Sequence, residues 1–252
     1  MRVHVLSDLH IEFNSFEYSA PAGEVDVIVL GGDIGLGNGG LKWIARSCPP
    51  SIPIVYVLGN HEYWGFDRFA AIAALQREAA DMRDNIFVLE DEAVSIQGVT
   101  FLGATLWSDF DLFRTPKLSM SIANEECPDF MLIRSGVDCF SAEQARTVHL
   151  NSLVWLKTQC CARRGERTVV VTHHPPVREA LHPQYDQSPL SPCFVSDRSD
   201  VVRDSGASLW VCGHAHQALD TRIGATRVVS NPAGYSSFSP VPNFRPHLVV
   251  EV

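Results

Sequence analysis

The sequence predicts an α/β fold, and the first indication is a set of short apolar runs. The runs at 25–30, 53–58 and 168–172 contain almost no polar residue, which is typical of parallel strands covered on both faces. Turn-forming glycines or prolines follow these runs, as expected where strands end. Apolar residues over 66–81 then recur at helical spacing, directly after one such strand. Strand, turn and helix in repetition form the βαβ pattern of a layered α/β protein.

The N-terminal part of the chain contains the first repeats of this pattern. Residues 3–6 form a short apolar run that predicts a strand, and the buried-type runs at 25–30 and 53–58 follow. Between the last two we expect a short helix over 41–48, because two prolines directly after it would stop it. The helix over 66–81 would then return along the sheet.

The middle of the chain is less regular. Between 86 and 106, turn residues at 91–92 and at Gly98 interrupt the apolar residues, which predicts a meander of short strands rather than a crossover. From 107 to 140 no period is evident, so we expect a long irregular loop. Such a loop in a compact domain is often a functional lid. Its arginines, Arg114 and Arg134, could hold a substrate phosphate, although most arginines are simply solvated.

The C-terminal part returns to regular elements. A capping box, with Ser141 at the N-cap and Gln144 at N3, predicts a helix that runs towards Arg163 and ends by Gly165. His149, in the middle of that helix, has no motif around it, and we expect it to be structural. The strands expected after the helix are 168–172, 208–212, 219–223, 226–230 and 248–252.

The composition limits the classes of function. The chain has 252 residues, of which 46% are hydrophobic and 19% charged, and it shows no linker or repeat. We therefore expect a single domain over 1–252. A formal net charge of −9 argues against a non-specific nucleic-acid binder, which normally carries a basic face. It leaves a small phosphorylated substrate open, because bound metal ions supply local positive charge.

Neither a membrane span nor a secretory signal is indicated. No apolar stretch is long enough to cross a bilayer, and the first residues lead directly into a polar motif. Seven cysteines without a Cys-x-x-Cys pair predict neither a thiolate zinc site nor a disulfide framework. A reducing cytoplasm is therefore the expected location.

Residues able to bind a metal follow apolar runs at five places. The carboxyl ends of strands in an open α/β sheet line the crevice where ligands bind. Turn residues that arose independently would not repeatedly be Asp, Asn and His. The residues at these strand ends are Asp8, His10, Asp33, Asn60, His61, His173, His214 and His216.

Taken one at a time, these residues also have ordinary structural interpretations. Asp8 could cap a turn, and Asn60 could form a turn hydrogen bond. The two histidines of the Gly-His-x-His step could belong to a plain loop. For the adjacent pair His173 and His174, the pattern alone does not decide which one faces the crevice. His182, in a later turn-rich loop, could line its mouth.

The combined pattern resembles the calcineurin-like metallophosphoesterase family. That family's signature is Asp-x-His, then Gly-Asp, then Gly-Asn-His-Asp/Glu, then a His, then Gly-His-x-His. In the same order this chain carries Asp8-Leu9-His10, Gly32-Asp33, Gly59-Asn60-His61-Glu62, His173 and Gly213-His214-Ala215-His216. The resemblance runs from Asp8 to His216 without a missing element, and each motif lies in the expected strand-end context.

The resemblance implies a four-layer α/β/β/α sandwich of two mixed sheets, with two metal ions at the strand ends. One ion would be held by Asp8, His10 and His216. The other would be held by Asn60, His173 and His214.

Two further roles follow from the resemblance. Asp33 would bridge the ions, since a carboxylate can offer one oxygen to each. His61 would not bind metal, but would donate a proton to the leaving oxygen or stabilise the phosphoryl charge.

The implied activity is metal-dependent hydrolysis of a phosphomonoester or phosphodiester, either a small molecule or a nucleotide. Nitrogen and oxygen ligands without thiolate suit two divalent or trivalent transition-metal ions, manganese first, with iron, zinc or nickel as alternatives. A phosphoprotein phosphatase or a nuclease could use the same site, although the acidic balance argues against a nuclease. A binding scaffold could keep the fold without catalysis, but retention of every ligand and of His61 argues against that.

Overall fold

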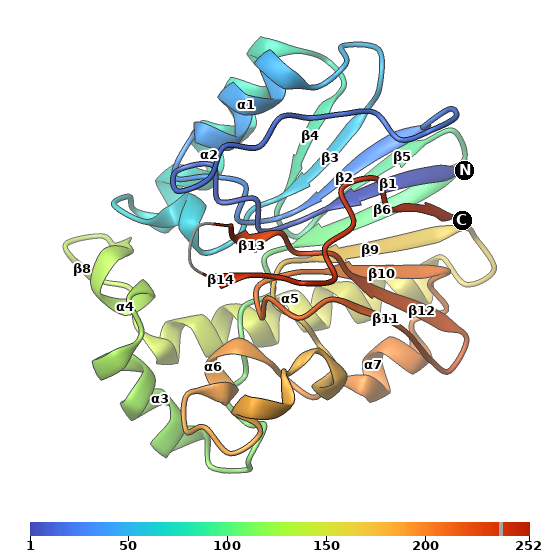
Figure 1. Ribbon diagram of the computed structural model, residues 1–252. Helices are drawn as coiled ribbons and strands as arrows, with labels where there is room; N and C mark the ends of the chain where they lie inside the picture. Colours follow the sequence, from blue (N-terminus) through green and yellow to red (C-terminus); the bar gives the residue numbers. More distant parts are fainter. Residues whose placement is uncertain (237–238) are drawn as a thin grey trace.

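The computed structural model describes residues 1–236 and 239–252, and most of its strands form two large sheets (Figure 1). In spatial order, the first sheet contains β15 (Val249–Glu251), β1 (Arg2–Leu6), β2 (Val27–Gly31), β3 (Ile54–Val57) and β4 (Ile86–Leu89). The second contains β11 (Leu219–Ile223), β12 (Thr226–Ser230), β10 (Leu209–Cys212), β9 (Thr168–Thr172), β6 (Val99–Ala104) and β5 (Glu92–Ile96). Both sheets are mixed, because the edge strands β15, β11 and β5 run antiparallel to neighbours that are otherwise parallel.

Helices and short hairpins complete the described chain. The α-helices are α1 (Gly39–Ser47), α2 (Arg68–Met82), α3 (Pro116–Glu126), α4 (Asp129–Leu132), α5 (Ala142–Ala162), α6 (Ser191–Phe194) and α7 (Ser199–Asp204). Short 3-10 helices cover His61–Tyr63, Arg178–Ala180 and Pro183–Tyr185. The hairpins pair β7 (Arg134–Ser135) with β8 (Asp138–Cys139), and β13 (Gly234–Tyr235) with β14 (Ser239–Pro240).

Alternating side chains of the strands build three apolar cores between four layers. Val29 of β2 and Val171 of β9 point into the core between the two sheets. Leu30, the next residue along β2, packs with α1 and α2 on the outer face of the first sheet. Trp210 of β10 packs with α5 and α7 on the outer face of the second. The helices therefore cover both outer faces, as Figure 1 shows, and the predicted α/β/β/α sandwich of two mixed sheets is confirmed.

The predicted meander over 86–106 was wrong in its pairing. β4 pairs in parallel with β3 at the edge of the first sheet, so α2 is a crossover helix. Only β5 and β6 form an antiparallel hairpin, and that hairpin belongs to the second sheet. The chain changes sheets at the turn before β5. Apolar strand patterns look alike in parallel and antiparallel pairings, so the local sequence could not distinguish the two.

The segment 107–140 is not the irregular loop that its sequence predicted. It contains α3, which begins with a proline at its first position, then α4 and the β7–β8 hairpin. Trp107, Phe110 and Phe130 are buried in the core of the first sheet. α3 buries only Ser119 and Ala123 and therefore shows no apolar period, and α4 has only four residues. Arg114 and Arg134 are exposed, and their binding of phosphate stays a prediction.

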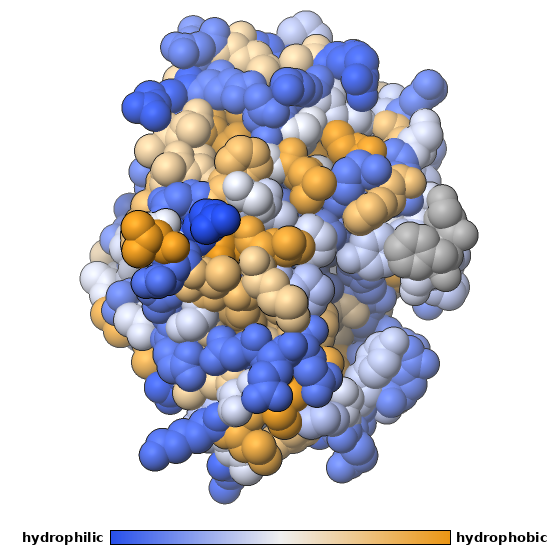
Figure 2. All heavy atoms as spheres, turned by 90° about the vertical axis from the view of Figure 1, so that its left-hand side faces the viewer, coloured by the Kyte–Doolittle hydropathy of each residue, from blue (hydrophilic) through white to orange (hydrophobic). Residues whose placement is uncertain are grey.

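One side of the molecule exposes several apolar side chains. Figure 2 shows this side, the left-hand side of Figure 1, with hydrophobic patches between hydrophilic ones. The elements near it carry the exposed side chains of Phe66, Phe69, Met131, Leu132 and Val137. Among the described residues, no helix combines the length and apolar character that a membrane span needs.

Candidate metal centre

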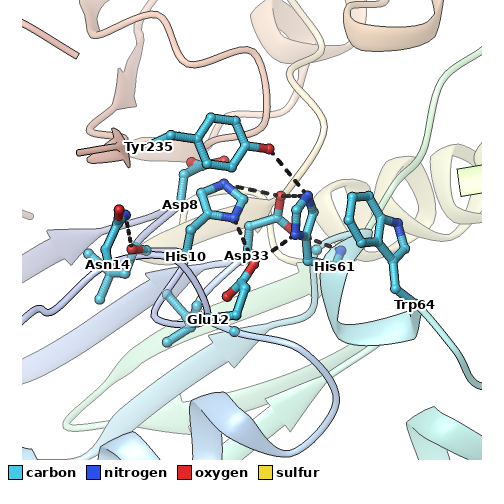
Figure 3. Close-up of polar contacts among 12 residues, drawn as sticks. Asp8, His10, Glu12, Asn14, Asp33, His61, Trp64 and Tyr235 are labelled. Carbon is cyan, nitrogen blue, oxygen red and sulfur yellow. Dashed lines mark hydrogen bonds and ion pairs between the residues drawn. The ribbon is translucent and has the colours of Figure 1, made fainter. Parts of the chain in front are cut away.

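The eight residues singled out in the sequence all follow C-terminal ends of parallel strands. Three neighbouring strands of the first sheet (β1, β2 and β3) and two of the second (β9 and β10) end at this place. Ends of adjacent parallel strands meet at one edge of a sheet, so the side chains converge. The potential ligand atoms of Asp8, His10 and His216 lie within 4.8 Å of one another, and so do those of Asp8, Asp33 and His173. Figure 3 shows part of this cluster.

The backbone of this region is strained at several of these residues. Five of them have positive φ: Asp8 (52°), His10 (46°), Asp33 (53°), His214 (63°) and His216 (48°). Non-glycine residues rarely adopt this left-handed conformation, and Asp and His do so more readily than most. Such strain costs on the order of 1–3 kcal/mol per residue and persists where the surrounding structure enforces it, often at functional sites.

Two glycines allow the strands to approach closely. A Cβ on Gly32, whose φ is +88°, would lie 2.3 Å from Nδ1 of His173. A Cβ on Gly213 would lie 2.5 Å from Oδ2 of Asp8. The glycines of the Gly-Asp and Gly-His-x-His motifs are therefore required by close packing against the candidate ligands.

A buried carboxylate beneath the site joins two of the loops. Oε1 of Glu62 accepts hydrogen bonds from the backbone N–H of Ile34 (2.8 Å) and the hydroxyl of Tyr56 (2.7 Å). Oε2 accepts from the N–H of Gly59 (2.7 Å) and of Asp33 (3.1 Å). Burial and the nearby Asp33 charge raise the pKa of Glu62, whereas the Tyr56 hydroxyl opposes that rise. Glu62 therefore fixes the loop after β2 to the loop after β3.

The first group of predicted ligands is arranged as a cation would require. Nε2 of His10 lies 3.0 Å from Nε2 of His216, although only one imidazole of such a pair can donate a proton. Oδ1 of Asp8 accepts from the backbone N–H of His214 (2.8 Å) and lies 3.5 Å from Nε2 of His216. Oδ2 of Asp8 is buried and has no hydrogen-bond partner among the described residues. These facing acceptor atoms fit a bound cation.

All three members of the second group are buried, whereas His216 of the first group is partly exposed. Nε2 of His173 lies 3.0 Å from Oδ1 of Asn60 and 3.2 Å from Nδ1 of His214. Burial lowers the pKa of His214 well below its ordinary value, which favours the neutral, metal-binding form. Ligand atoms of His173, His174 and His214 also lie within 4.8 Å of one another. His174 is thus a further candidate, although its Nδ1 lies 3.3 Å from the carbonyl oxygen of Thr105.

Asp33 lies between the two groups. Its Oδ2 is 3.4 Å from Nε2 of His173, 3.8 Å from Nε2 of His10 and 3.9 Å from Nε2 of His61. Burial by itself would raise the pKa of Asp33, but His173 and His61 lower it well below the ordinary value. A carboxylate charge is therefore stabilised at the centre of the cluster.

His61 is held by neighbours that the sequence did not reveal. Its Nδ1 lies 2.8 Å from Oε1 of Glu12, and its ring stacks on Trp64 with 3.7 Å between centroids. Nε2 lies 3.4 Å from the hydroxyl of Tyr235 (Figure 3). Burial would lower the pKa of His61, but Asp33 and Glu12 outweigh it and raise the pKa to about 9. The alternation Asp8-x-His10-x-Glu12 is the one sequence signal that could have found Glu12.

Asp129 is the other residue that sequence reasoning missed. It is only 3% exposed, and its Oδ1 accepts from Nδ2 of Asn60 (2.8 Å) and from Nε1 of Trp64 (2.7 Å). Because the amide nitrogen of Asn60 is fixed in this way, its Oδ1 is free to face the cluster. Asp129 lies in α4, inside the segment that seemed irregular, and no sequence motif marks it.

Comparison with known proteins agrees with this geometry. A family model described as calcineurin-like phosphoesterase matches residues 1–218. The protein L509 of Acanthamoeba polyphaga mimivirus is 22% identical over 275 residues, which cover 98% of this chain and 95% of that protein. Among solved structures, the phosphopantetheinyl hydrolase PptH of Mycobacterium tuberculosis shares the fold. Its TM-score is 0.69 at 18% identity, over 93% of this chain and 90% of that one.

The family match spans all the motifs from which the cluster is built, and the cluster offers histidine and aspartate groups able to bind metal ions. The chain belongs to the calcineurin-like phosphoesterase family and is a metal-dependent hydrolase of phosphoesters.

Proposed function

We propose that this chain hydrolyses a small phosphomonoester or phosphodiester at a dinuclear metal centre. One ion would be held by Asp8, His10 and His216, and the other by Asn60, His173 and His214. Asp33 would bridge them. His61 would act as the proton donor.

The position of Asp33 carries this proposal. Its Oδ2 faces Nε2 of His10 from one group at 3.8 Å and Nε2 of His173 from the other at 3.4 Å. A single ionised carboxylate between two clusters of nitrogen and oxygen atoms suits two cations that share one ligand. A mononuclear site would leave one of the two clusters of nitrogen and oxygen atoms without a bound cation.

The residues present fit transition-metal ions. All candidate ligand atoms are nitrogen or oxygen, and Oδ2 of Asp8 is buried without a hydrogen-bond partner among the described residues. This set suits manganese first, with iron, zinc or nickel as alternatives. When bound, two such ions would supply Lewis acidity that neutralises the phosphoryl charge and activates water for attack.

The protein's own contribution to the reaction centres on His61. Its Nε2 lies 3.9 Å from Oδ2 of Asp33, and the carboxylates of Asp33 and Glu12 outweigh burial and raise the pKa of His61 to about 9, which favours the protonated imidazole. That proton can pass to the oxygen that leaves phosphorus, so the product departs as a neutral alcohol. General acid catalysis of this kind contributes roughly 10²–10⁴-fold to the rate. Trp64 keeps the ring plane fixed during the transfer.

The substrate is proposed only as a class. PptH, by its name, hydrolyses a phosphopantetheinyl group, and its likeness to this chain is one of fold. A phosphopantetheinyl ester therefore belongs in a substrate panel beside simple aryl monoesters and diesters. A single domain over 1–252 and a cytoplasmic location remain predictions. The latter is supported by seven cysteines that are all free.

The test combines metal counting with turnover. Protein stripped by a chelator and refilled with manganese, iron, zinc or nickel is assayed for bound metal by mass spectrometry. It is then assayed for hydrolysis of p-nitrophenyl phosphate and bis-p-nitrophenyl phosphate. We expect a pair of ions per chain and turnover that Asp33→Asn abolishes, whereas the exposed control Asp84→Asn leaves both unchanged.

Two outcomes contradict the proposal. Activity that survives both the chelator and Asp33→Asn would exclude a bridged metal centre. A binding scaffold would be favoured if no ester is hydrolysed with saturating manganese and if His61→Asn has the same measured properties as the wild type.

A further inference from the structure

One oxygen atom of Glu12 contacts two histidines of the site at once. Oε1 lies 2.8 Å from Nδ1 of His61 and 3.2 Å from Nδ1 of His10. The two rings stand edge to face, with 4.4 Å between centroids and 68° between planes. Figure 3 shows Glu12 between them, on the side of the rings away from Tyr235. No other described carboxylate oxygen contacts Nδ1 of both rings.

Hydrogen-bond chemistry decides which nitrogen of each ring carries a proton here. An ionised carboxylate has no proton to donate and only accepts, so both Nδ1 atoms must be the donors. For His10 this leaves Nε2 with its lone pair directed to His216 and Asp33. For His61 it leaves Nε2 directed to Asp33, at 3.9 Å. The contact with Glu12 therefore fixes the direction of both inward-facing nitrogens.

The turn that carries Glu12 is held independently of any metal. The N–H of Ile11 donates to the carbonyl of Ile34 (3.0 Å), next to the loop that carries Asp33. The side chain of Asn14 donates to the carbonyl oxygens of Leu9 (2.7 Å) and Gly234 (2.8 Å). The side chain of Glu12 is itself only 11% exposed. The backbone of the turn that carries Glu12 is thus held by contacts that involve neither imidazole.

We propose that Glu12 is a positioning residue that aligns His10 and His61 together. By accepting Nδ1–H from both rings, it directs Nε2 of His10 to the metal and Nε2 of His61 to the leaving oxygen. The consequence for the reaction rests on the proposed function above. The two hydrogen bonds do not, because they require neither metal nor substrate.

Nuclear magnetic resonance of the metal-free protein tests the hydrogen bonds directly. Imidazole Nδ1–H protons in such bonds resonate downfield and exchange slowly with water. Other buried histidines, such as His173, whose Nδ1 lies 2.8 Å from the carbonyl oxygen of Gly31, can give signals of the same kind. Among all such signals we expect one that is lost in His10→Asn and another that is lost in His61→Asn. Both should disappear in Glu12→Ala and persist in Glu17→Ala, whose carboxylate is exposed on the same segment. Absence of both signals in the wild type, or their persistence in Glu12→Ala, overturns the proposal.

Leaving-group dependence tests the consequence for catalysis. Glu12→Ala should lower kcat about 10²-fold for an alkyl ester, which needs its leaving oxygen protonated. The loss should be less than about 10-fold for a p-nitrophenyl ester, whose leaving group departs as a stable anion. Glu12→Gln, which keeps one acceptor oxygen, should recover part of the difference. Glu17→Ala should match the wild type with both esters.

Metal binding provides a third measurement. Loss of the contact to His10 should weaken the binding of one ion by about 10–100-fold, as calorimetry would measure. If Glu12→Ala lowers kcat equally with both esters and leaves the metal affinity unchanged, Glu12 has only a structural role and the proposal is overturned. If Glu12→Ala does not fold, Glu12→Gln and Glu12→Asp carry the same comparisons. If the wild type hydrolyses no ester, the proposed function fails, while the spectra still decide the role of Glu12.

Discussion

The two halves of the candidate centre are supported by carboxylates of different origin. In the Asp8 half (Asp8, His10 and His216) the supporting residue is Glu12, two residues after the histidine that it contacts. In the Asn60 half (Asn60, His173 and His214) it is Asp129, which lies 69 residues after Asn60.

The halves also differ in their exposure. The side chain of His216 is 21% exposed, whereas that of His173 is fully buried. All three members of the Asn60 half are buried, which limits the access of water. We therefore expect the Asn60 half to exchange its ion more slowly. Support from a residue nearby in sequence accompanies the half that has one partly exposed member, His216, and support from a distant segment accompanies the half whose three members are all buried.

The largest effect is expected at Glu62, which fixes the loop of Asp33, the residue between the halves, to the loop of Asn60. Glu62→Gln replaces an acceptor-only carboxylate with an amide whose NH₂ group faces backbone N–H donors. Each buried donor left without an acceptor costs about 1–3 kcal/mol, so unfolding in urea should begin at a clearly lower concentration. Both metal affinities should fall together. Exposed Glu24→Gln is the control, and a loss confined to one ion would show that Glu62 does not join the halves.

The next effect should distinguish the halves. Asp129→Ala leaves Nδ2 of Asn60 and Nε1 of Trp64 without their acceptor. We expect one ion to bind about 10–100-fold more weakly. The free energy of unfolding should fall by about 1–3 kcal/mol for each unpaired donor. Calorimetric metal titration and urea unfolding would measure this, with exposed Asp138→Asn as control. If the binding of both ions weakens equally, Asp129 does not support the Asn60 half alone.

Acid should destabilise the segment that supports the Asn60 half. Nδ1 of His149 contacts the carbonyl oxygen of Trp107 (3.2 Å), at the start of that segment. Burial lowers the pKa of His149 below its ordinary value of 6.5. As the pH falls, the unfolded chain therefore binds a proton that the folded chain does not bind. Stability is therefore present above about pH 6.5 and is lost as the pH falls, by up to about 1.4 kcal/mol per pH unit.

Urea unfolding between about pH 7 and about pH 5 measures this slope. His149→Asn should flatten it, whereas the exposed control His247→Asn should not. An unchanged slope in His149→Asn would assign the acid sensitivity to other groups, such as His174 and His214, whose pKa values burial also lowers.

The smallest expected effect is an energetic coupling between the supports of the two halves, Glu12 and Asp129. The ring of His61, which contacts Glu12, stacks on Trp64, and Trp64 donates to Asp129. Because the two carboxylates share this chain of contacts, Glu12→Gln and Asp129→Asn should not add, and the coupling should be about 0.5–1 kcal/mol. A double-mutant cycle of unfolding in the metal-free protein measures it. Repeating the cycle with Trp64→Phe should remove the coupling, and strict additivity in the wild type would contradict it.

Much of the fold could be predicted because buried strands and capped helices carry local signals. The capping box of Ser141 and Gln144 is formed in the structure at the start of α5. The strand-end residues also come together, because the residues that follow parallel strands ending at one edge of a sheet must lie near one another. Their roles as ligands remain predictions, which the metal experiments above address.

What failed in the prediction had a common cause. The pairing of β4 and the helices of 107–140 depend on contacts with distant parts of the chain rather than on local periodicity. Trp107 and Phe130 are buried by residues far away in sequence, so their surroundings were invisible in a window of neighbours.

The sequence by itself determined the strands, the glycines between them and the residue types at their exits, because each depends on local backbone geometry and side-chain chemistry. Only the tertiary structure decided which groups hold those residues in place. Hydrogen bonds such as those from Asn60 to Asp129, or from His61 to Glu12, depend on distances of about 3 Å across loops. Packing of separate elements sets such distances, and no local pattern of residues encodes them.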